Sequence, residues 1–176
     1  MTTEKHPVPD AENYRYRALG IDPGLAATGY AVIGTRTQGG ELCHWGSIRT
    51  TSGRPVPGRL QIIYKGVDDL LKKWRPVIMV VEDVYVLDTY PRAAIQLGEV
   101  KGVVYLAAQD NAVEVVTVKP TEAKSCLTGN GRAPKHQVSR AVRRILDLDR
   151  DIKPDHASDA AALALIGLSR KGLYVW

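Results

Sequence analysis

Four side chains that could bind a metal ion stand at the ends of apolar segments that are far apart in the chain. Asp22 follows one short apolar segment, and Glu82 follows another. His156 and Asp159 lie three residues apart at the start of a third, and at that spacing on a helix both side chains face the same way. Metal-assisted phosphodiester hydrolysis needs ligands that converge from separate elements, and carboxylates suit hard divalent cations. The four residues are typical of that chemistry.

Each of these residues also has a simpler structural explanation when it is taken alone. Asp22 precedes Pro-Gly and could be a turn residue, and Glu82 could be the first solvated residue after a strand. Asp155 could cap the last helix, which would leave His156 exposed and Asp159 near the positive end of the helix dipole. The combination is more specific, because three separate elements each place a carboxylate or an imidazole at one end.

The elements that would carry these residues are read from the spacing of apolar side chains. Strand patterns cover residues 16–22, 29–34, 41–49, 77–81 and 113–118, and helical patterns cover 58–73, 93–109, 138–146 and 157–168. Gly-rich connections join the first three strands, which indicates an antiparallel meander. The uninterrupted apolar run at 77–81 indicates a strand that is buried on both faces. The order β-β-β-α-β-α-β-α-α predicts an α/β domain with a mixed sheet flanked by helices.

Length and composition limit the class of protein. The 176 residues fit one domain, which we expect at 15–170, between a flexible N-terminal tail at 1–14 and a C-terminal tail at 171–176. A net charge of +5 and a pI of about 9.2 favour polyanionic partners such as nucleic acid. No apolar run is long enough to cross a bilayer, no targeting segment is evident, and two distant cysteines make no disulfide framework. These features predict a cytoplasmic protein.

Five segments together resemble the RuvC family of Holliday-junction endonucleases. In chain order they are ALGIDPGLAATGYAVI, PGRLQIIYKGVDDLL, VVEDVYV, AAIQLGEVKGVVYLAA and HASDAAALALI, and the similarity extends over about residues 17–168. The Asp-Pro-Gly motif alone is weak, because sugar kinases and actin-like ATPases also hold phosphate with an Asp-Gly turn, but the ordered set is specific. The resemblance implies an RNase H-like fold: a mixed five-stranded sheet, with an antiparallel meander followed by parallel strands, flanked by helices.

The resemblance also implies a role for each candidate ligand. The metal-binding acids of the family match Asp22, Glu82 and Asp159, and its remaining ligand position, which is Asp or His in the family, falls on His156. These four would be the catalytic and metal-binding residues of a metal-dependent crossover junction endodeoxyribonuclease. Two Mg²⁺ ions per site would support hydrolysis that leaves 5′-phosphate and 3′-hydroxyl ends. We expect Mn²⁺ to substitute, because imidazole tolerates manganese better than magnesium.

The contacts with DNA are expected on two further parts of the chain. The resemblance assigns base stacking near the crossover to Tyr85, and the alternative is a tyrosine that fills a crevice beside the strand. Lys124 and Lys135 match basic positions that the family uses on DNA phosphate. Arg132 and Arg140 add positive charge nearby, and the alternative for such arginines is a solvated helix face.

The resemblance implies a homodimer, whose two-fold symmetry would match that of a four-way junction and allow paired symmetric nicks in recombination and repair. Small residues repeat at intervals of four at Ala94, Gly98 and Gly102, where another backbone could come close. This strip could form part of the dimer interface, or it could pack against the sheet of its own protomer. Branch-migration proteins are further partners that the resemblance implies.

Three other functions are compatible with parts of the pattern. The first is an RNase H-like nuclease that acts on other branched DNA, such as forks and flaps. The second is a junction-binding protein that does not cut, although a pure binder has no need for clustered buried charge. The third is a nucleotide-binding fragment of a kinase-like protein, but the chain is too short for the usual two lobes and has no evident second phosphate loop.

Overall fold

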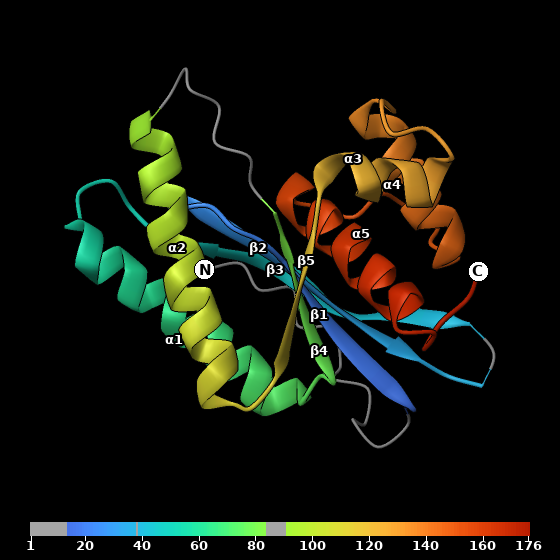
Figure 1. The fold of residues 1–176 in the computed structure, drawn as a ribbon, viewed down its shortest axis with the longest axis horizontal. Helices are drawn as coiled ribbons and strands as arrows, with labels where there is room; N and C mark the ends of the chain where they lie inside the picture. The colour runs from blue at the N-terminus through green and yellow to red at the C-terminus, as the bar shows by residue number, and fades with distance from the viewer. Residues whose placement is uncertain (1–13, 38, 84–90) are drawn as a thin grey trace.

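The structure is a computed structural model, and it describes residues 14–37, 39–83 and 91–176. Its sheet has five strands in the order β3-β2-β1-β4-β5 (Figure 1). Their bounds are β1 Tyr16–Asp22, β2 Ala27–Thr35, β3 Gly40–Arg49, β4 Ile78–Glu82 and β5 Glu114–Val118. The first three strands pair antiparallel, and β4 and β5 run parallel to β1. The predicted mixed sheet, a meander followed by parallel strands, is confirmed.

Helices cover both faces of the sheet, and each face has its own hydrophobic core (Figure 1). Two helices lie on one face, α1 Val56–Trp74 and α2 Pro91–Asp110. Three lie on the other face, α3 Pro120–Thr128, α4 Lys135–Ile145 and α5 Asp155–Arg170. The central strands β1, β2 and β4 are largely buried between these layers. In β4, the residues Ile78–Val81 are at most 2% exposed. The buried strand predicted at 77–81 is thus confirmed for residues 78–81, whereas Val77 precedes the strand and is 45% exposed.

Two glycines and an alanine-rich helix fix the position of α5 on the sheet. A Cβ atom on Gly20 of β1 would lie 1.8 Å from the carbonyl oxygen of Ala160, and one on Gly29 of β2 would lie 2.2 Å from that of His156. Only glycine permits so close an approach of two backbones. The first turns of α5 therefore lie directly over the ends of β1 and β2, where Asp22 pairs with Gly29.

The helix α3 corrects the predicted order of elements, which had no helix between β5 and α4. It has only nine residues, of which only Ala123 and Leu127 are buried. A helix this short shows too few apolar repeats to stand out as a period in the sequence. The order is β-β-β-α-β-α-β-α-α-α.

The suggestion that Asp155 caps the last helix is also wrong. The N-cap position of α5 is Pro154, and no side chain donates or accepts a capping hydrogen bond there. Asp155 is the first residue of the helix, and its carboxylate accepts a hydrogen bond from Nζ of Lys153 at 2.7 Å. Its negative charge in the first turn still favours the helix dipole.

The C-terminal residues after α5 are in contact with the domain. Leu173 and Tyr174 pack against the core on the α5 face, and the Tyr174 hydroxyl donates a hydrogen bond to the carbonyl oxygen of Ile145. Cys43 and Cys126 are free thiols, in agreement with the prediction of no disulfide framework. In the described part of the chain, no helix has both the length and the apolar character that a membrane span requires.

Candidate active site

The parallel pairing of β1 and β4 places two acidic residues side by side at the carboxyl ends of these two strands. Ile21 pairs with Val81, so that Asp22 and Glu82, the next residue of each strand, end neighbouring strands. The carboxyl ends of β4 and β5 and the start of α5 lie at this same end (Figure 1). Because α5 crosses β1 and β2 at the glycines described above, its first turn brings His156 and Asp159 to these strand ends.

Three of the four predicted ligands converge closely. Asp22, His156 and Asp159 each offer a ligand atom, and these atoms lie within 4.8 Å of one another. Nδ1 of His156 and Oδ2 of Asp22 are hydrogen-bonded at 2.6 Å; an ionised Asp22 accepts this bond from the Nδ1–H tautomer. Two carboxylates and an imidazole are a donor set that fits a divalent cation, and the imidazole favours Mn²⁺ relative to an all-oxygen site.

Glu82 lies outside this close group but belongs to the same electrostatic site. Burial, together with the negative charges of Asp22 and Asp159, raises the pKa of Glu82 to about 7. Burial likewise raises the pKa of Asp22, against the lowering effect of its hydrogen bond with His156. Partly buried carboxylates that repel one another are stabilised by a bound cation. The electrostatics of the site are therefore those of a cation site.

Two lysines from the α3–α4 side reach the acidic cluster. Nζ of Lys135 lies 2.7 Å from Oδ2 of Asp159, and this hydrogen bond raises the pKa of the lysine. The positive charge of Lys124, on α3, counteracts the rise in the pKa of Glu82. The two positions predicted to contact DNA phosphate thus stand beside the candidate ligands.

The other predicted DNA contacts have different surroundings. Arg132 is exposed in the turn before α4, where its backbone N–H donates to Oδ1 of Asn130 at 2.9 Å. Arg140 is exposed on α4 and lines a cavity together with Lys135. Tyr85 lies outside the described residues.

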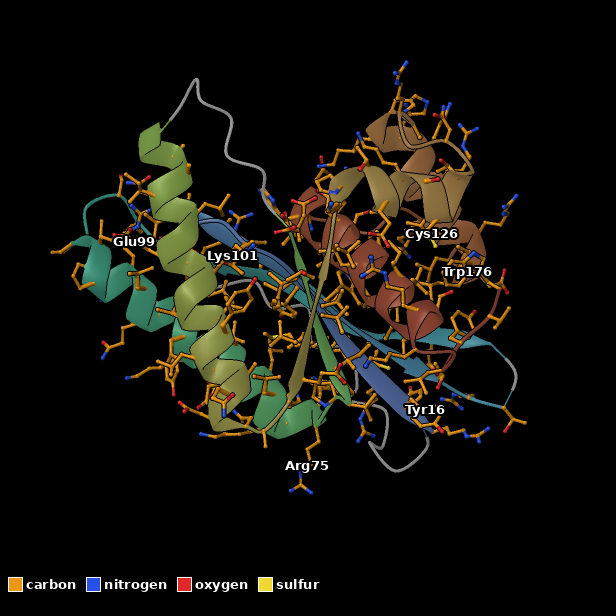
Figure 2. All side chains as sticks on the ribbon, in the orientation of Figure 1. Tyr16, Arg75, Glu99, Lys101, Cys126 and Trp176 are labelled. Atoms are coloured by element: carbon orange, nitrogen blue, oxygen red, sulfur yellow. The ribbon has the colours of Figure 1, made fainter. Side chains whose placement is uncertain are left out.

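The sequence did not identify two contacts that hold the site in place. Thr28 is fully buried, and its hydroxyl donates to the carbonyl oxygen of Gly24 at 2.8 Å, which closes the loop that follows Asp22. Lys101 lies on the sheet side of α2 and Glu99 on the opposite side (Figure 2). Nζ of Lys101 is 3.4 Å from Oδ1 of Asp83, next to Glu82. The sign of this contact in the sequence is that Lys101 interrupts the apolar residues of α2.

The strip of small residues on α2 does not pack against the sheet. Among the residues that the structure describes, no atom lies within 4 Å of a Cβ built on Gly98 or Gly102. Ile95 and Leu106, on the same helix, are 65% and 53% exposed. The alternative that the strip serves packing within the protomer is wrong for the two glycines.

Comparison with known proteins agrees with this fold and site. The family model "Crossover junction endodeoxyribonuclease RuvC" matches residues 18–167. A protein of that name from Caldanaerobacter subterraneus subsp. tengcongensis is 38% identical over 149 residues, which are 85% of this chain and 90% of the relative.

Solved structures show the same similarity. Thermus thermophilus RuvC in complex with a Holliday junction substrate matches with a TM-score of 0.83 and 30% identity, over 90% of this chain and 98% of that one. The yeast mitochondrial Holliday junction resolvase Ydc2, 16% identical, shares the fold with a TM-score of 0.61 over 86% of this chain and 77% of its own. The chain belongs to the RuvC family of crossover junction endodeoxyribonucleases.

Proposed function

We propose that this protein resolves four-way DNA junctions by paired symmetric nicks, each a phosphodiester hydrolysis that leaves a 5′-phosphate and a 3′-hydroxyl. The observation that carries the proposal is the convergence of Asp22, His156 and Asp159 within 4.8 Å, at the strand ends where Glu82 also lies. Family membership supports the substrate, because a relative 30% identical to this chain has been solved with a Holliday junction.

The donor set suits divalent cations, and we propose that Asp22, Glu82, His156 and Asp159 hold two Mg²⁺ ions, with Mn²⁺ as a substitute. When bound, such ions lower the pKa of a water nucleophile and stabilise the charge on the leaving 3′-oxygen. The residues fit a metal ion because their carboxylates repel one another. Without a bound metal ion, burial and the charges of Asp22 and Asp159 raise the pKa of Glu82 to about 7.

The side chains of the protein supply orientation and charge. Asp22 holds the His156 ring through the hydrogen bond to Nδ1, a contact that fixes the tautomer and orientation of an imidazole ligand. Lys135 and Lys124 bring positive charge to the same place, where a phosphodiester group would approach. We assign them, with Arg132 and Arg140, to the DNA phosphates.

Two such sites are needed for paired nicks, and we propose that α2 forms part of a homodimer interface. Gly98 and Gly102 leave room for a second backbone, and Ile95 and Leu106 present exposed apolar surface on the same helix. At helical spacing Ile95, Gly98, Gly102 and Leu106 fall on one face of α2, and a contiguous exposed apolar face of this kind is typical of a protein interface. An isologous two-fold dimer would place equivalent sites on the two strands of a junction.

Substrate comparison tests the proposed selectivity. Purified protein in Mg²⁺ is incubated with labelled four-way junctions, replication forks and nicked duplexes of the same arm sequences. We expect cleavage of the four-way junction at least about tenfold faster than that of either other substrate. Equal or faster cutting of forks would favour a nuclease for other branched DNA and contradict the proposal.

A further inference from the structure

A cavity of about 350 Å³ adjoins the candidate metal ligands on the α4–α5 side. Its lining includes Lys135, Ser139, Arg140, Arg143, Lys153 and Ser158. It lies next to the site, because Lys135 of its lining is ion-paired with Asp159 and Ser158 precedes Asp159 on α5. A liquid water occupies about 30 Å³, so a phosphate group and part of its sugar fit this volume.

The cavity carries one cation without a matching anion. Four cationic side chains and two carboxylates, Asp151 and Asp155, line it. Three of the cations are paired: Lys135 with Asp159, Arg143 with Asp151 at 3.6 Å, and Lys153 with Asp155 at 2.7 Å. Within residues 14–37, 39–83 and 91–176, the Arg140 side chain has no hydrogen-bond or ion-pair partner. Its guanidinium is therefore available to an anion.

Two hydroxyl groups add hydrogen-bond donors to the same cavity. Ser158 is a buried polar residue, and its Oγ lies 3.5 Å from Oγ of Ser139. Hydroxyl hydrogen bonds are usually about 2.7–2.8 Å long, so this contact satisfies neither group well. An anion in the cavity could accept hydrogen bonds from both serines.

The paired cations can also turn toward an anion. Arg143 and Asp151 are 42% and 55% exposed, and the exposure of Lys153 and Asp155 is greater still. Exposed ion pairs contribute little free energy, of the order of 0–1 kcal/mol. A phosphate therefore competes with Asp151 and Asp155 at small cost.

We propose that this cavity binds one backbone phosphate of the cut DNA strand, distinct from the scissile phosphate, through Arg140 and the hydroxyls of Ser139 and Ser158. The inference rests on the proposed function and adds a second fixed point for the strand. A strand held at two phosphates has its direction through the site defined. Arg140 is then a positioning residue, since it does not touch the reacting atoms.

The test is a series of four-way junctions in which single phosphates flanking the cut site are replaced, one at a time, by uncharged methylphosphonates. For the unaltered protein, we expect one position at which the replacement weakens binding about tenfold, the loss of one charge-assisted contact. Arg140→Ala should weaken binding of the unmodified junction by a similar factor. It should lower the slope of log K against log salt by about one.

The two changes should not add, because they remove the same contact. Arg140→Ala is expected to be insensitive to the methylphosphonate at that position while it remains sensitive elsewhere. Arg144→Ala is the matched control, because Arg144 is an exposed arginine on the same helix that does not line the cavity. This variant should keep the sensitivity of the unaltered protein at that position.

Two results would overturn the inference. One is tolerance of a methylphosphonate at every flanking position, and the other is full additivity with Arg140→Ala. Both measurements use junctions that the unaltered protein cuts. A protein that cuts no four-way junction contradicts the proposed function instead, so the two failures are distinguishable.

Discussion

At the residue scale, the imidazole of His156 distinguishes this site from one made of carboxylates alone. Its Nδ1 is hydrogen-bonded to Asp22, and the ligand atoms of His156, Asp22 and Asp159 lie within 4.8 Å of one another. Because nitrogen ligands favour Mn²⁺ over Mg²⁺, we expect Mn²⁺ to support cleavage at least as well as Mg²⁺. His156→Asp should retain cleavage and lower the ratio of Mn²⁺ to Mg²⁺ rates at least about threefold. Clear inhibition of the unaltered protein by Mn²⁺ would count against His156 as a ligand.

Glu82 makes the stability of the metal-free protein depend on pH. Burial and neighbouring carboxylates raise its pKa from 4.5 to about 7 in the fold. Between these values the folded chain binds a proton that the unfolded chain has lost, so the stability falls as pH rises through this window. Above pH 7 the free energy of unfolding stays at this lower value.

Glu82→Gln removes this dependence. At pH 8 without divalent cations, we expect its melting temperature to exceed that of the unaltered protein by roughly 2–4 °C, the effect of about 1 kcal/mol in a chain of this length. Added Mg²⁺ should stabilise the unaltered protein more than Glu82→Gln, which keeps the group of Asp22, His156 and Asp159 but lacks the fourth carboxylate. Identical pH profiles for the two proteins in a calorimeter would contradict the electrostatic account.

From their places at strand ends and at a helical i, i+3 spacing, the sequence predicted that the four candidate ligands would converge. The structure brings Asp22, His156 and Asp159 within 4.8 Å and places Glu82 at the end of the strand beside Asp22. The sequence could not predict the cavity beside them. That cavity depends on how α4 lies against the loop at 151–153 and on Ser158, contacts that no period in the sequence encodes. The pairing of Lys101 with Asp83 is hidden for the same reason.

At the scale of elements, the contact of α5 with β1 positions the site, and Gly20 permits it. A methyl group at that position would lie 1.8 Å from the Ala160 carbonyl oxygen. We expect Gly20→Ala to lower the free energy of unfolding by about 3 kcal/mol or more and to displace His156 and Asp159 from Asp22. Urea denaturation measures the first effect, and cleavage of the folded fraction measures the second.

Gly58→Ala is the control for this change. Gly58 lies in α1, and no atom of residues 14–37, 39–83 and 91–176 lies within 4 Å of the added methyl group. Alanine in a helix is favoured over glycine by about 1 kcal/mol or less, so this variant should be as stable as the unaltered protein or more so. Equal stability of the two alanine variants would refute the close packing.

The elements themselves were largely predictable, with α3 as the exception. Long amphipathic patterns such as that of α1 and a continuous apolar strand such as β4 have strong local signals. The nine residues of α3 do not, and the position of Lys124 beside Glu82 follows from that helix. The packing of α5 on β1 and β2 could not be predicted, because the need for glycine at positions 20 and 29 becomes apparent only when α5 is in place.

At the scale of the whole molecule, paired nicks require two sites and therefore two protomers. We expect the protein to be a dimer by sedimentation equilibrium, and Ile95→Asp to shift it toward monomer by about 1–3 kcal/mol. In this variant, junctions should accumulate single nicks. Val77→Asp, at another exposed apolar position in the loop before β4, should leave the dimer intact. A variant at Ile95 that stays dimeric would exclude this face of α2 as an interface.

The most direct measurement of the central claim is cleavage of a labelled synthetic four-way junction in Mg²⁺, with EDTA and Asp22→Asn as controls. We predict symmetric nicks in two opposite strands, lost in EDTA and reduced more than about 100-fold by Asp22→Asn, with junction binding retained. This loss exceeds the 10–100-fold typical of residues that only support a metal ligand. Binding without cutting by the unaltered protein, in both Mg²⁺ and Mn²⁺, would contradict the assignment of this site as a metal-dependent nuclease.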